Sequence, residues 1–265
     1  MDITSTSNPR IKELVMLGEK SRYRREKGLF TVEGRREVAA CLAGGFTPRT
    51  VFYCPQIISA GGVEGLFAAS RVEFVSISEN VYSKIAYRGT TEGLVAVFKA
   101  KERGLRDIRL SNSSPFVIVL ESVEKPGNLG AVLRTADASG AAAVIVCDPL
   151  TDLYNPNLIR ASIGGIFTVP VAACTSQQAY DWLHALGFQI LTAQLQDSSP
   201  YYDIDFRRPT AVVFGTESTG LTEFWRERSD RKIIIPMLGK LDSLNVSTSV
   251  AILSYEAVRQ KQAAL

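Results

Sequence analysis

The side chains best suited to chemistry stand in three segments of the second half of the chain, each directly after an apolar run. In the first segment, 121–136, a Pro-Gly turn leads into a predicted helix with Asn128 near its cap. Arg134 follows on the side of that helix opposite an apolar stripe, so it reaches away from the core. The stripe consists of Leu129, Val132, Leu133 and Ala136. Alone, this segment fits a helix cap and a surface arginine as well as a site.

The second segment, 212–221, runs from a buried strand into a turn that holds two threonines, a serine and the carboxylate of Glu217. Gly215 opens this turn, and a glycine allows close approach by a ligand. Open α/β sheets place their ligands at such turns, at the carboxyl ends of strands. For this segment alone, a generic strand-to-helix turn is the simpler alternative.

The third segment, 233–247, ends a strand at Pro236 and, after a loop, opens a helix near Ser243 and Asn245. Either of the two polar residues could be no more than a helix cap. Apolar residues then recur at spacings of four, three and four. They predict that this helix has an apolar face, which packs on the sheet or on a partner subunit. These residues are Val246, Val250, Leu253 and Ala257.

Several other kinds of site are missing from the sequence. No GxGxxG or GxxxxGK[ST] pattern is present, which argues against a Rossmann dinucleotide site and a P-loop. The single histidine, His184, cannot supply a multi-histidine metal site, and the four scattered cysteines form no CxxC pair. We therefore expect chemistry without a metal or a histidine, in a reducing cytoplasm. No apolar run reaches the roughly 20 residues of a membrane span, and we see no secretory signal.

The elements that must position the three segments alternate between strands and helices. Uniformly apolar runs, typical of strands buried on both faces, occupy 116–120, 143–147, 188–192, 210–214 and 232–235. Helices are predicted at 128–139, 155–163, 176–186 and 246–262. These lengths suit βαβ units, so the second half predicts an α/β fold with an open, mainly parallel sheet.

The first hundred residues predict a smaller α/β domain. A helical stripe at 11–17 is followed by a helix at 34–42 and by β-branched or aromatic runs, which predict strands at 29–32, 50–53, 72–75 and 93–98. The polar stretch 101–115 is rich in turn formers and predicts a linker. We therefore place one domain at 1–100 and a second at 116–265.

Positive charge gathers near the N-terminus, although the net charge of the whole chain is only +3. Residues 1–36 hold nine Lys and Arg against five Asp and Glu, and the stretch 20–27 packs five cations around Tyr23. Such a cluster suits phosphates, and the tyrosine can stack on a base. A solvated helix end is the alternative interpretation. The candidate phosphate ligands are Arg22, Arg24, Arg25 and Lys27.

Taken together, the three segments resemble the SpoU/TrmH family of RNA ribose 2′-O-methyltransferases, within the SPOUT superfamily. They are similar to the family motifs N-x5-R-T-A, F-G-x-E-x-x-G-L and I-P-M-x-G-x-x-x-S-L-N-V-S, in this order. Residues 1–100 also resemble the RNA-binding domain that precedes the catalytic domain in many members, through 7–12, 30–34 and 93–96. This second resemblance adds Arg10 and Lys12 to the expected RNA contacts.

The resemblance implies a trefoil knot that binds S-adenosylmethionine in a bent conformation, and a homodimer packed through the knot region. The implied cofactor contacts are Thr192, Ala193, Gly215, Ile235, Pro236, Met237 and Leu244. In the implied reaction a ribose 2′-hydroxyl attacks the cofactor's methyl group. Because a guanidinium with a pKa above about 12 is a poor base, we expect Arg134 to stabilise the incipient alkoxide or to hold a phosphate. The implied positioning residues are Asn128, Glu217, Ser243 and Asn245.

The expected N-terminal domain favours ribosomal RNA as the substrate, by analogy between accessory domains. A transfer-RNA 2′-O-methyltransferase is one alternative. A second is a non-catalytic RNA-binding protein that retains the fold, although such a protein has no reason to keep the polar residues of all three motifs. A ribonuclease of a different fold fits poorly, because the chain lacks a carboxylate cluster and additional histidines.

Overall fold

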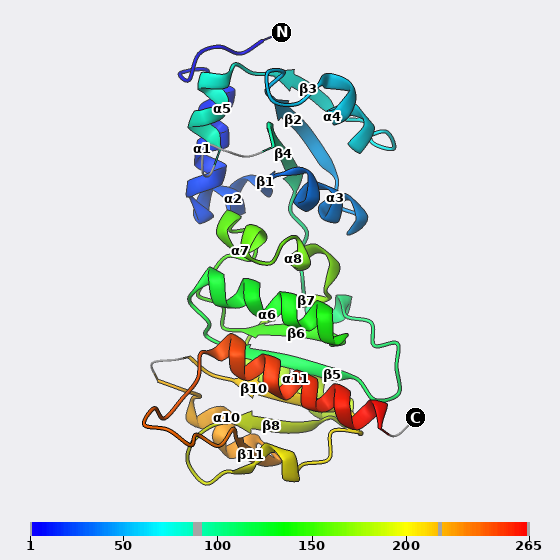
Figure 1. Ribbon diagram of the computed structural model, residues 1–265, viewed down its shortest axis with the longest axis vertical. Coiled ribbons are helices and arrows are strands. Elements are labelled where there is room, and N and C mark those ends of the chain that lie inside the picture. Colours follow the sequence, from blue (N-terminus) through cyan, green and yellow to red (C-terminus); the bar gives the residue numbers. More distant parts are fainter. Residues whose placement is uncertain (1, 87–91, 217–218, 264–265) are drawn as a thin grey trace. The chain divides into compact units, whose positions relative to one another are not determined.

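The computed structural model describes residues 2–86, 92–216 and 219–263, and its contacts divide the chain into two compact units (Figure 1). The N-terminal unit comprises Met1–Glu102 together with Asp152–Thr168, and the C-terminal unit comprises Arg103–Thr151 and Val169–Leu265. The segment Asp152–Thr168 therefore packs with the N-terminal unit, although it lies inside the range 116–265 that we assign to the second domain.

A four-stranded sheet forms the centre of the N-terminal unit, in the order β1-β4-β2-β3. β4 is antiparallel to both β1 and β2, whereas β2 and β3 are parallel. The strands are β1 (Leu29–Glu33), β2 (Pro48–Tyr53), β3 (Glu73–Ser76) and β4 (Leu94–Lys99). The helices are α1 (Pro9–Glu19), α2 (Ser21–Lys27), α3 (Arg35–Ala43), α4 (Ala60–Leu66), α5 (Glu79–Ile85), α7 (Pro156–Ala161) and α8 (Gly165–Thr168). The four strands lie within two residues of their predicted bounds.

Aromatic packing explains why Asp152–Thr168 belongs to the N-terminal unit. The ring of Tyr154 stacks on Phe30 with 4.3 Å between centroids, and Phe167 packs edge-on against Phe46 at 5.2 Å. Phe30 is fully buried. The segment therefore completes the core of that unit.

The C-terminal unit is built on a seven-stranded sheet, in the order β7-β6-β5-β10-β8-β11-β9, and all of its described pairings are parallel. The strands are β5 (Phe116–Glu121), β6 (Ala143–Cys147), β7 (Val171–Cys174), β8 (Gln189–Ala193), β9 (Ser199–Pro200), β10 (Thr210–Phe214) and β11 (Arg231–Ile234). The helices are α6 (Pro126–Ser139), α9 (Ser176–Ala185), α10 (Glu223–Arg228) and α11 (Val246–Gln262). The predicted α/β fold with an open parallel sheet is thereby confirmed.

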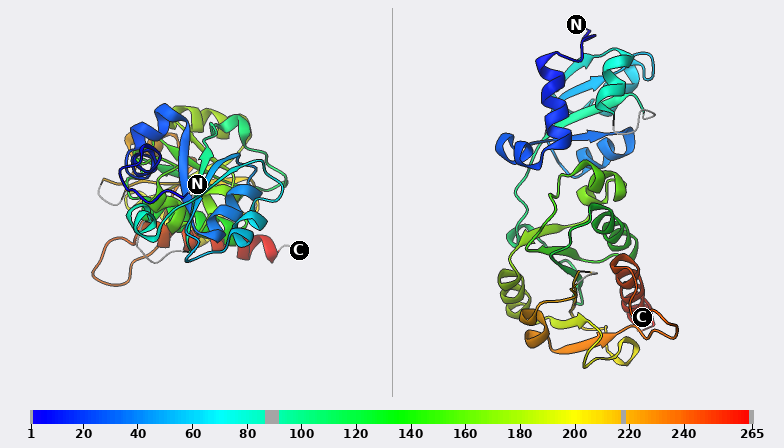
Figure 2. Two further views of the ribbon diagram at one scale, coloured as in Figure 1. Left: turned by 90° about the horizontal axis from the view of Figure 1, so that it is seen from above. Right: turned by 90° about the vertical axis from the view of Figure 1, so that its left-hand side faces the viewer.

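Helices cover both faces of this sheet, with α6 and α11 on one face and α9 and α10 on the other (Figure 2). β5, β6 and β10 are buried along their whole length, as uniformly apolar runs predict. Alternate side chains of a strand point to opposite faces, and Val117 and Val119 share one core cluster with Leu183 of α9 and Trp225 of α10. Packing on both faces holds the strands of the sheet in place, and with them the strand ends.

The apolar positions of α11 serve the core of the unit itself. α11 packs against α6 and β5. Its buried side chains include Val246, Val250, Leu253 and Ala257. Of the two roles that the spacing allows, packing on the sheet or on a partner subunit, the structure shows the first.

Candidate active site

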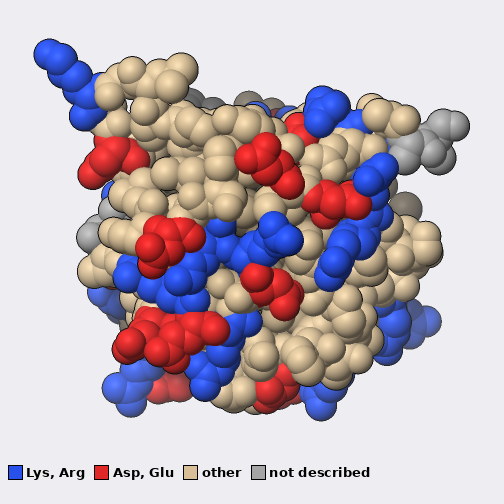
Figure 3. Space-filling model, turned by 90° about the horizontal axis from the view of Figure 1, so that it is seen from below, with Lys and Arg blue, Asp and Glu red and all other residues tan. Residues whose placement is uncertain are grey.

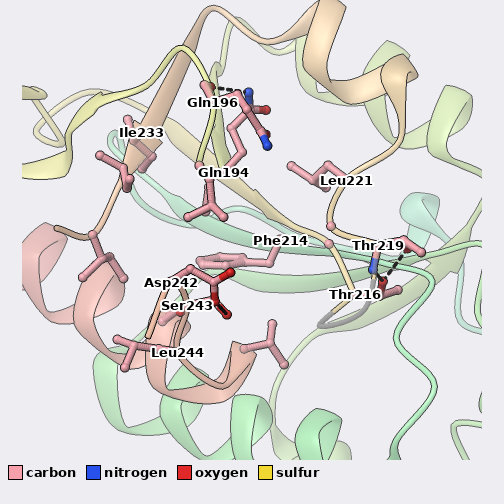
Figure 4. A pocket seen from close by; sticks show the side chains of 18 of the residues that line it. Gln194, Gln196, Phe214, Thr216, Thr219, Leu221, Ile233, Asp242, Ser243 and Leu244 are labelled. Carbon is pink, nitrogen blue, oxygen red and sulfur yellow. Dashed lines mark hydrogen bonds between the residues drawn. The ribbon is translucent and has the colours of Figure 1, made fainter. Parts of the chain in front are cut away.

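A cavity of about 340 Å³ opens where β8, β10 and β11 end, between the second and third motif segments (Figure 4). The carboxyl ends of these parallel strands meet at one edge of the sheet, which is the position that open α/β sheets use for ligands. The lining comprises 193–196, 214–216, 219–221, Arg226, 233–235, Met237, 242–244, Val246 and Ser249. Residues far apart in the sequence therefore converge on one small volume.

Five of the seven predicted cofactor contacts line this cavity. They are Ala193, Gly215, Ile235, Met237 and Leu244. Pro236 is not among the lining residues. Thr192 is fully buried, and its hydroxyl donates to that of Ser229 at 3.1 Å. The side chain of Thr192 thus ties β8 to the C-cap of α10 instead of lining the cavity.

The protein's own backbone leaves no room for a side chain at Gly215. A β-carbon at this position would lie 2.2 Å from the carbonyl carbon of Gly220 and 2.4 Å from the amide nitrogen of Leu221. The turn closes through reciprocal backbone hydrogen bonds between Thr216 and Gly220, at 3.2 and 3.0 Å. The close approach that the glycine predicts is therefore made by the protein's own backbone.

Several lining residues lie outside the predicted set. Phe214 and Leu221 bring apolar side chains from the two ends of the second motif, and the hydroxyls of Thr216 and Thr219 lie 2.7 Å apart. Phe214 and Leu221 belong to the second motif, whereas Gln194 is marked only by its position directly after a strand. Further polar lining residues that the motifs do not single out are Gln194, Gln196, Arg226, Asp242 and Ser249. The predicted Glu217 lies outside the described residues.

A hydrogen bond joins the first and third motifs. The Asn245 side-chain nitrogen donates to the Oδ1 of Asn128 at 3.3 Å. Asn245 is also the N-cap of α11, because its Oδ1 accepts from the amide of Ser247 at 3.0 Å. Asn128 is not a cap: α6 begins at Pro126, with Lys125 as its N-cap, since proline suits the first position of a helix. The two asparagines thus contact each other where their helices begin.

Arg134 is exposed on α6, opposite the buried stripe, as the helical spacing predicts. Within the described part of the chain, no hydrogen bond or ion pair engages its guanidinium. Ser243 lines the cavity, and its hydroxyl donates to the Oδ1 of Asp242 at 3.1 Å. The first motif therefore offers a free positive charge, and the third offers a hydroxyl at the cavity wall.

A buried carboxylate that no motif singles out holds α10 in place. Glu121, at the end of β5, accepts hydrogen bonds from the Thr222 amide at 2.9 Å and from the Thr222 hydroxyl at 2.7 Å. Ser176, at the start of α9, donates to Asp148 at 2.6 Å and accepts from the indole of Trp225 at 3.2 Å. These bonds fasten the starts of α9 and α10 to the ends of the central strands.

Arg24 is not available to phosphates, which corrects one predicted RNA contact. Only 3% of this residue is exposed. Its Nε donates to Asp152 at 2.6 Å, and its Nη1 donates to the carbonyl of Leu17 at 2.7 Å. One cation of the 20–27 cluster therefore points inward and stabilises the N-terminal unit.

Two more of the predicted RNA contacts are paired with acidic side chains. Arg10 forms a double hydrogen bond with Glu73, at 2.9 and 2.5 Å, and this contact lowers the pKa of the Glu73 carboxyl. Arg22 pairs with Glu26 one helical turn away, at 2.7 Å. Both ion pairs are exposed and therefore weak. The two glutamates thus compete only weakly with other anions for these arginines.

The remaining predicted RNA contacts are exposed cations. Lys12 lies on α1, whereas Arg25 and Lys27 lie on α2. The Lys27 ammonium is 5.5 Å from the centroid of the Tyr23 ring. By contrast, basic and acidic side chains are interspersed over the face of the molecule seen in Figure 3. That face offers no broad area of positive charge.

Among the described residues, no helix is both long and apolar enough to cross a membrane. No group of three or more His, Cys, Asp or Glu side chains in residues 2–86, 92–216 and 219–263 is arranged to hold a metal ion.

Comparison with known proteins covers both units. Residues 115–255 match the SpoU rRNA methylase family, and residues 8–96 match the MRM3-like substrate binding domain. A crystal structure of an RNA 2′-O ribose methyltransferase is 37% identical, with a TM-score of 0.85 over 99% of this chain and 100% of that one. The AdoMet-bound rRNA methyltransferase from Sinorhizobium meliloti is 31% identical, with a TM-score of 0.88 over 98% and 97%. The 23S rRNA (uridine(2479)-2′-O)-methyltransferase of Streptomyces viridochromogenes is 30% identical over 93% of this chain and 88% of its own length.

The parallel sheet, the cavity at its carboxyl edge and these likenesses define an RNA methylase. More narrowly, the chain belongs to the SpoU rRNA methylase family. The resemblance that the three motifs predict is thereby confirmed. The trefoil knot stays a prediction.

Proposed function

We propose that the protein transfers the methyl group of S-adenosylmethionine to a ribose 2′-hydroxyl of ribosomal RNA. Its family membership supports RNA methyl transfer, and the similar proteins include a 2′-O-methyltransferase of 23S rRNA and a structure with AdoMet bound. The single observation that carries the proposal is the cavity at the ends of β8, β10 and β11, where the second and third motif segments meet.

The cavity suits the cofactor in size and in chemistry. A volume of about 340 Å³ falls within the range of small-molecule sites, and apolar walls from Phe214, Met237 and Leu244 stand beside polar groups. When bound there, S-adenosylmethionine supplies the methyl group. Ala193, Gly215 and the other predicted contacts that line the cavity are our proposed cofactor contacts.

A ribose hydroxyl is a weak nucleophile at neutral pH, so the site must stabilise the negative charge that develops on its oxygen. We assign this role to Arg134, whose charge is permanent and which has no partner among the described residues. Asn128 and Asn245 are hydrogen-bonded to each other, and each lies at the start of a helix. We assign to this pair, together with Ser243, the role of positioning the ribose. Glu217 keeps its predicted positioning role.

Arg134→Ala tests this division of roles. We expect methyl transfer to a 23S rRNA transcript to fall about 100-fold or more, because the developing charge loses its stabilising cation. The affinity for S-adenosylmethionine, measured by calorimetric titration, should stay unchanged. Arg208→Ala, at an exposed arginine of the same unit, is the control and should retain both properties. Equal loss of transfer and of cofactor binding would contradict the assignment, and a wild-type protein that binds no cofactor would overturn the proposed function.

The N-terminal unit is our proposed RNA-binding region. Its match to a substrate binding domain and its exposed cations Lys12, Arg25 and Lys27 support this role, with Tyr23 available for stacking. Arg10 and Arg22 reach RNA by exchanging their carboxylate partners for phosphates.

A homodimer packed through the loop between β11 and α11 is also proposed. Leu238 is 98% exposed and Leu241 is 75% exposed, and neighbouring apolar side chains in water indicate an interaction surface. Leu241→Glu should therefore produce monomers in sedimentation experiments, because a charge would be buried in the contact. Leu186→Glu, at a half-exposed leucine elsewhere in the unit, should leave the dimer intact. A monomeric wild-type protein would contradict this proposal.

The cysteines support the expected cytoplasmic location. All four are free, and Cys41, Cys54 and Cys147 are buried. A hydrogen bond with Cys174 and burial raise the pKa of the Cys147 thiol, which keeps it protonated. Buried thiols without disulfides are typical of a reducing compartment.

A further inference from the structure

A second cavity, of about 830 Å³, lies within the N-terminal unit beside β1, which is an edge strand of its sheet. Its wall is built by α1, α2, β1, the end of α5 and α7, and all of its described lining residues belong to that unit. The volume falls within the range of small-molecule sites. The proposed methyl transfer does not use this cavity, so its polar groups call for a separate explanation.

The edge strand turns backbone groups outward, toward the cavity. Gly34 donates to the carbonyl of Leu94 at 3.4 Å, and Ala100 donates to that of Gly28 at 2.8 Å. In an antiparallel pair only alternate residues bond to the neighbouring strand, so the even-numbered residues of β1 bond to β4. The amide and the carbonyl of Thr31, at the centre of β1, therefore point away from the sheet. Thr31 is one of the residues that line the cavity.

The hydroxyl of Thr31 is also without a partner. Only 8% of this residue is exposed, and no hydrogen bond engages the hydroxyl or the two outward backbone groups in residues 2–86, 92–216 and 219–263. The hydroxyl is not among the polar atoms that packing seals from solvent, so it opens on the cavity. A buried threonine with three open hydrogen-bonding groups indicates a polar ligand, because buried polar groups are normally paired.

Two carboxylates converge at the end of β1. A β-carbon on Gly34 would lie 2.7 Å from the Oε2 of Glu37 and 3.9 Å from the Oε2 of Glu92, so both oxygens stand beside the same backbone position. Glu92 also accepts a hydrogen bond from the amide of Arg35. Both carboxylates line the cavity. Because a carboxylate accepts hydrogen bonds and donates none, this end of the cavity favours a ligand rich in N–H donors.

Cations stand where the cavity meets solvent. Lys20, Lys84 and Arg160 line it, and all three are exposed. Lys20 directly precedes α2, which also carries the proposed RNA contacts Arg25 and Lys27. The apolar lining includes Leu14, Ile85 and Val95. An RNA strand can therefore keep its phosphates at the cations while one base enters between apolar side chains.

We propose that this cavity binds one unstacked guanine base of the RNA substrate. Guanine carries its N1–H and its amino group side by side, and these donors match the carboxylate of Glu37, while its O6 accepts from the Thr31 hydroxyl. Uracil would instead turn a carbonyl oxygen toward the carboxylates. The match of residues 8–96 to a substrate binding domain covers β1 and both carboxylates. This assignment rests on the proposed function, because it concerns the same substrate.

Fluorescence anisotropy with two single-stranded RNA probes tests the assignment. One probe is a short oligouridylate, and the other is the same strand with a single central guanosine. The wild-type protein should bind the guanosine probe about 10-fold more tightly, because only that base offers paired donors. Replacing the guanosine by inosine, which lacks the amino group, should remove most of this preference.

Two variants remove the groups that should carry the preference. Glu37→Gln should bind both probes with equal affinity, and Thr31→Val should lose part of the preference. Affinity for the oligouridylate should stay unchanged in both variants, which shows that they fold. Glu79→Gln, at an exposed carboxylate of the same unit, is the control and should keep the wild-type preference.

A wild-type protein that binds both probes alike would overturn the assignment, and so would a preference that survives in both variants. Equal loss of both probes in Glu37→Gln would overturn it as well, because the substitution would then distort the unit instead of removing a contact to one base. Methyl transfer to a 23S rRNA transcript, measured with the same wild-type protein, separates these failures from that of the proposed function, which the absence of transfer would contradict.

Discussion

At the scale of single residues, Gly215 shows how the cavity depends on one missing atom. Its β-carbon would overlap the backbone of Gly220 and Leu221, at 2.2 to 2.4 Å. The second motif therefore folds back on itself only because this position has no side chain. The glycine shapes the cavity by allowing this turn.

Gly215→Ala should destabilise the C-terminal unit by about 1–3 kcal/mol, because the turn must shift to relieve the overlap. Cofactor affinity should fall with stability, since the shifted turn lines the cavity. Chemical denaturation and calorimetry would measure the two effects. Gly239→Ala is the matched control, because a β-carbon there meets no atom within 4 Å. A variant as stable as wild type would show that the turn relaxes freely.

Sequence patterns predict single residues only where the pattern is local. Helical periodicity places Arg134 on the exposed side of α6, and the structure agrees. The same reasoning fails for Arg24, because its buried partner Asp152 stands 128 residues away. The unpaired hydroxyl of Thr31 is likewise invisible in the sequence, since burial depends on packing between distant segments.

At the scale of elements, the buried parallel strands are the most predictable part of the fold. β10 has its predicted bounds, and β11 differs from 232–235 by one residue at each end, because continuous apolar runs mark both. The helix predicted at 155–163 is present as α7 (Pro156–Ala161), which ends two residues early, and the short helix α8 (Gly165–Thr168) was not predicted. Ile163 and Gly164 adopt positive φ angles of 53° and 81° there, and a β-branched residue gives no warning of such a turn.

Glu121 links β5 to α9, because it accepts from the Ser176 hydroxyl at 3.4 Å, and to α10 through Thr222. Its removal should therefore affect more than its own strand. Glu121→Ala should destabilise the C-terminal unit by about 1–3 kcal/mol, because the amide and hydroxyl of Thr222 lose their acceptor. Cofactor affinity should also fall, since α10 carries Arg226, which lines the cofactor cavity. Urea denaturation and calorimetry would measure these effects. Glu124→Ala, at an exposed carboxylate in the following loop, is the control, and an equal effect of both substitutions would contradict the argument.

At the scale of the whole molecule, reversing positive charges of the N-terminal unit should weaken RNA binding without changing the residues assigned to methyl transfer. Lys12→Glu combined with Arg25→Glu should weaken binding to 23S rRNA and should reduce the slope of log affinity against log salt by roughly 1.5 to 2. The physical reason is that RNA binding releases fewer counterions when the protein makes fewer contacts with phosphates. Fluorescence anisotropy at several salt concentrations would measure the slope.

The control for this measurement is Arg208→Glu combined with Arg231→Glu, which changes the net charge equally but in the C-terminal unit. This variant should keep the wild-type slope. If both double variants lose affinity to the same extent, net charge rather than the N-terminal unit governs RNA binding.

The polar composition of 101–115 marks one connection between the units, but nothing in the sequence reveals that a later segment returns to the first unit. Because Asp152–Thr168 does so, the chain passes between the two units three times. A protease that cuts within 101–115 severs one passage only. The two fragments then share the N-terminal unit, held together by the stacked ring of Tyr154 and the buried ion pair of Arg24. A single nick therefore cannot release a complete N-terminal domain, because the domain is not one continuous piece of chain.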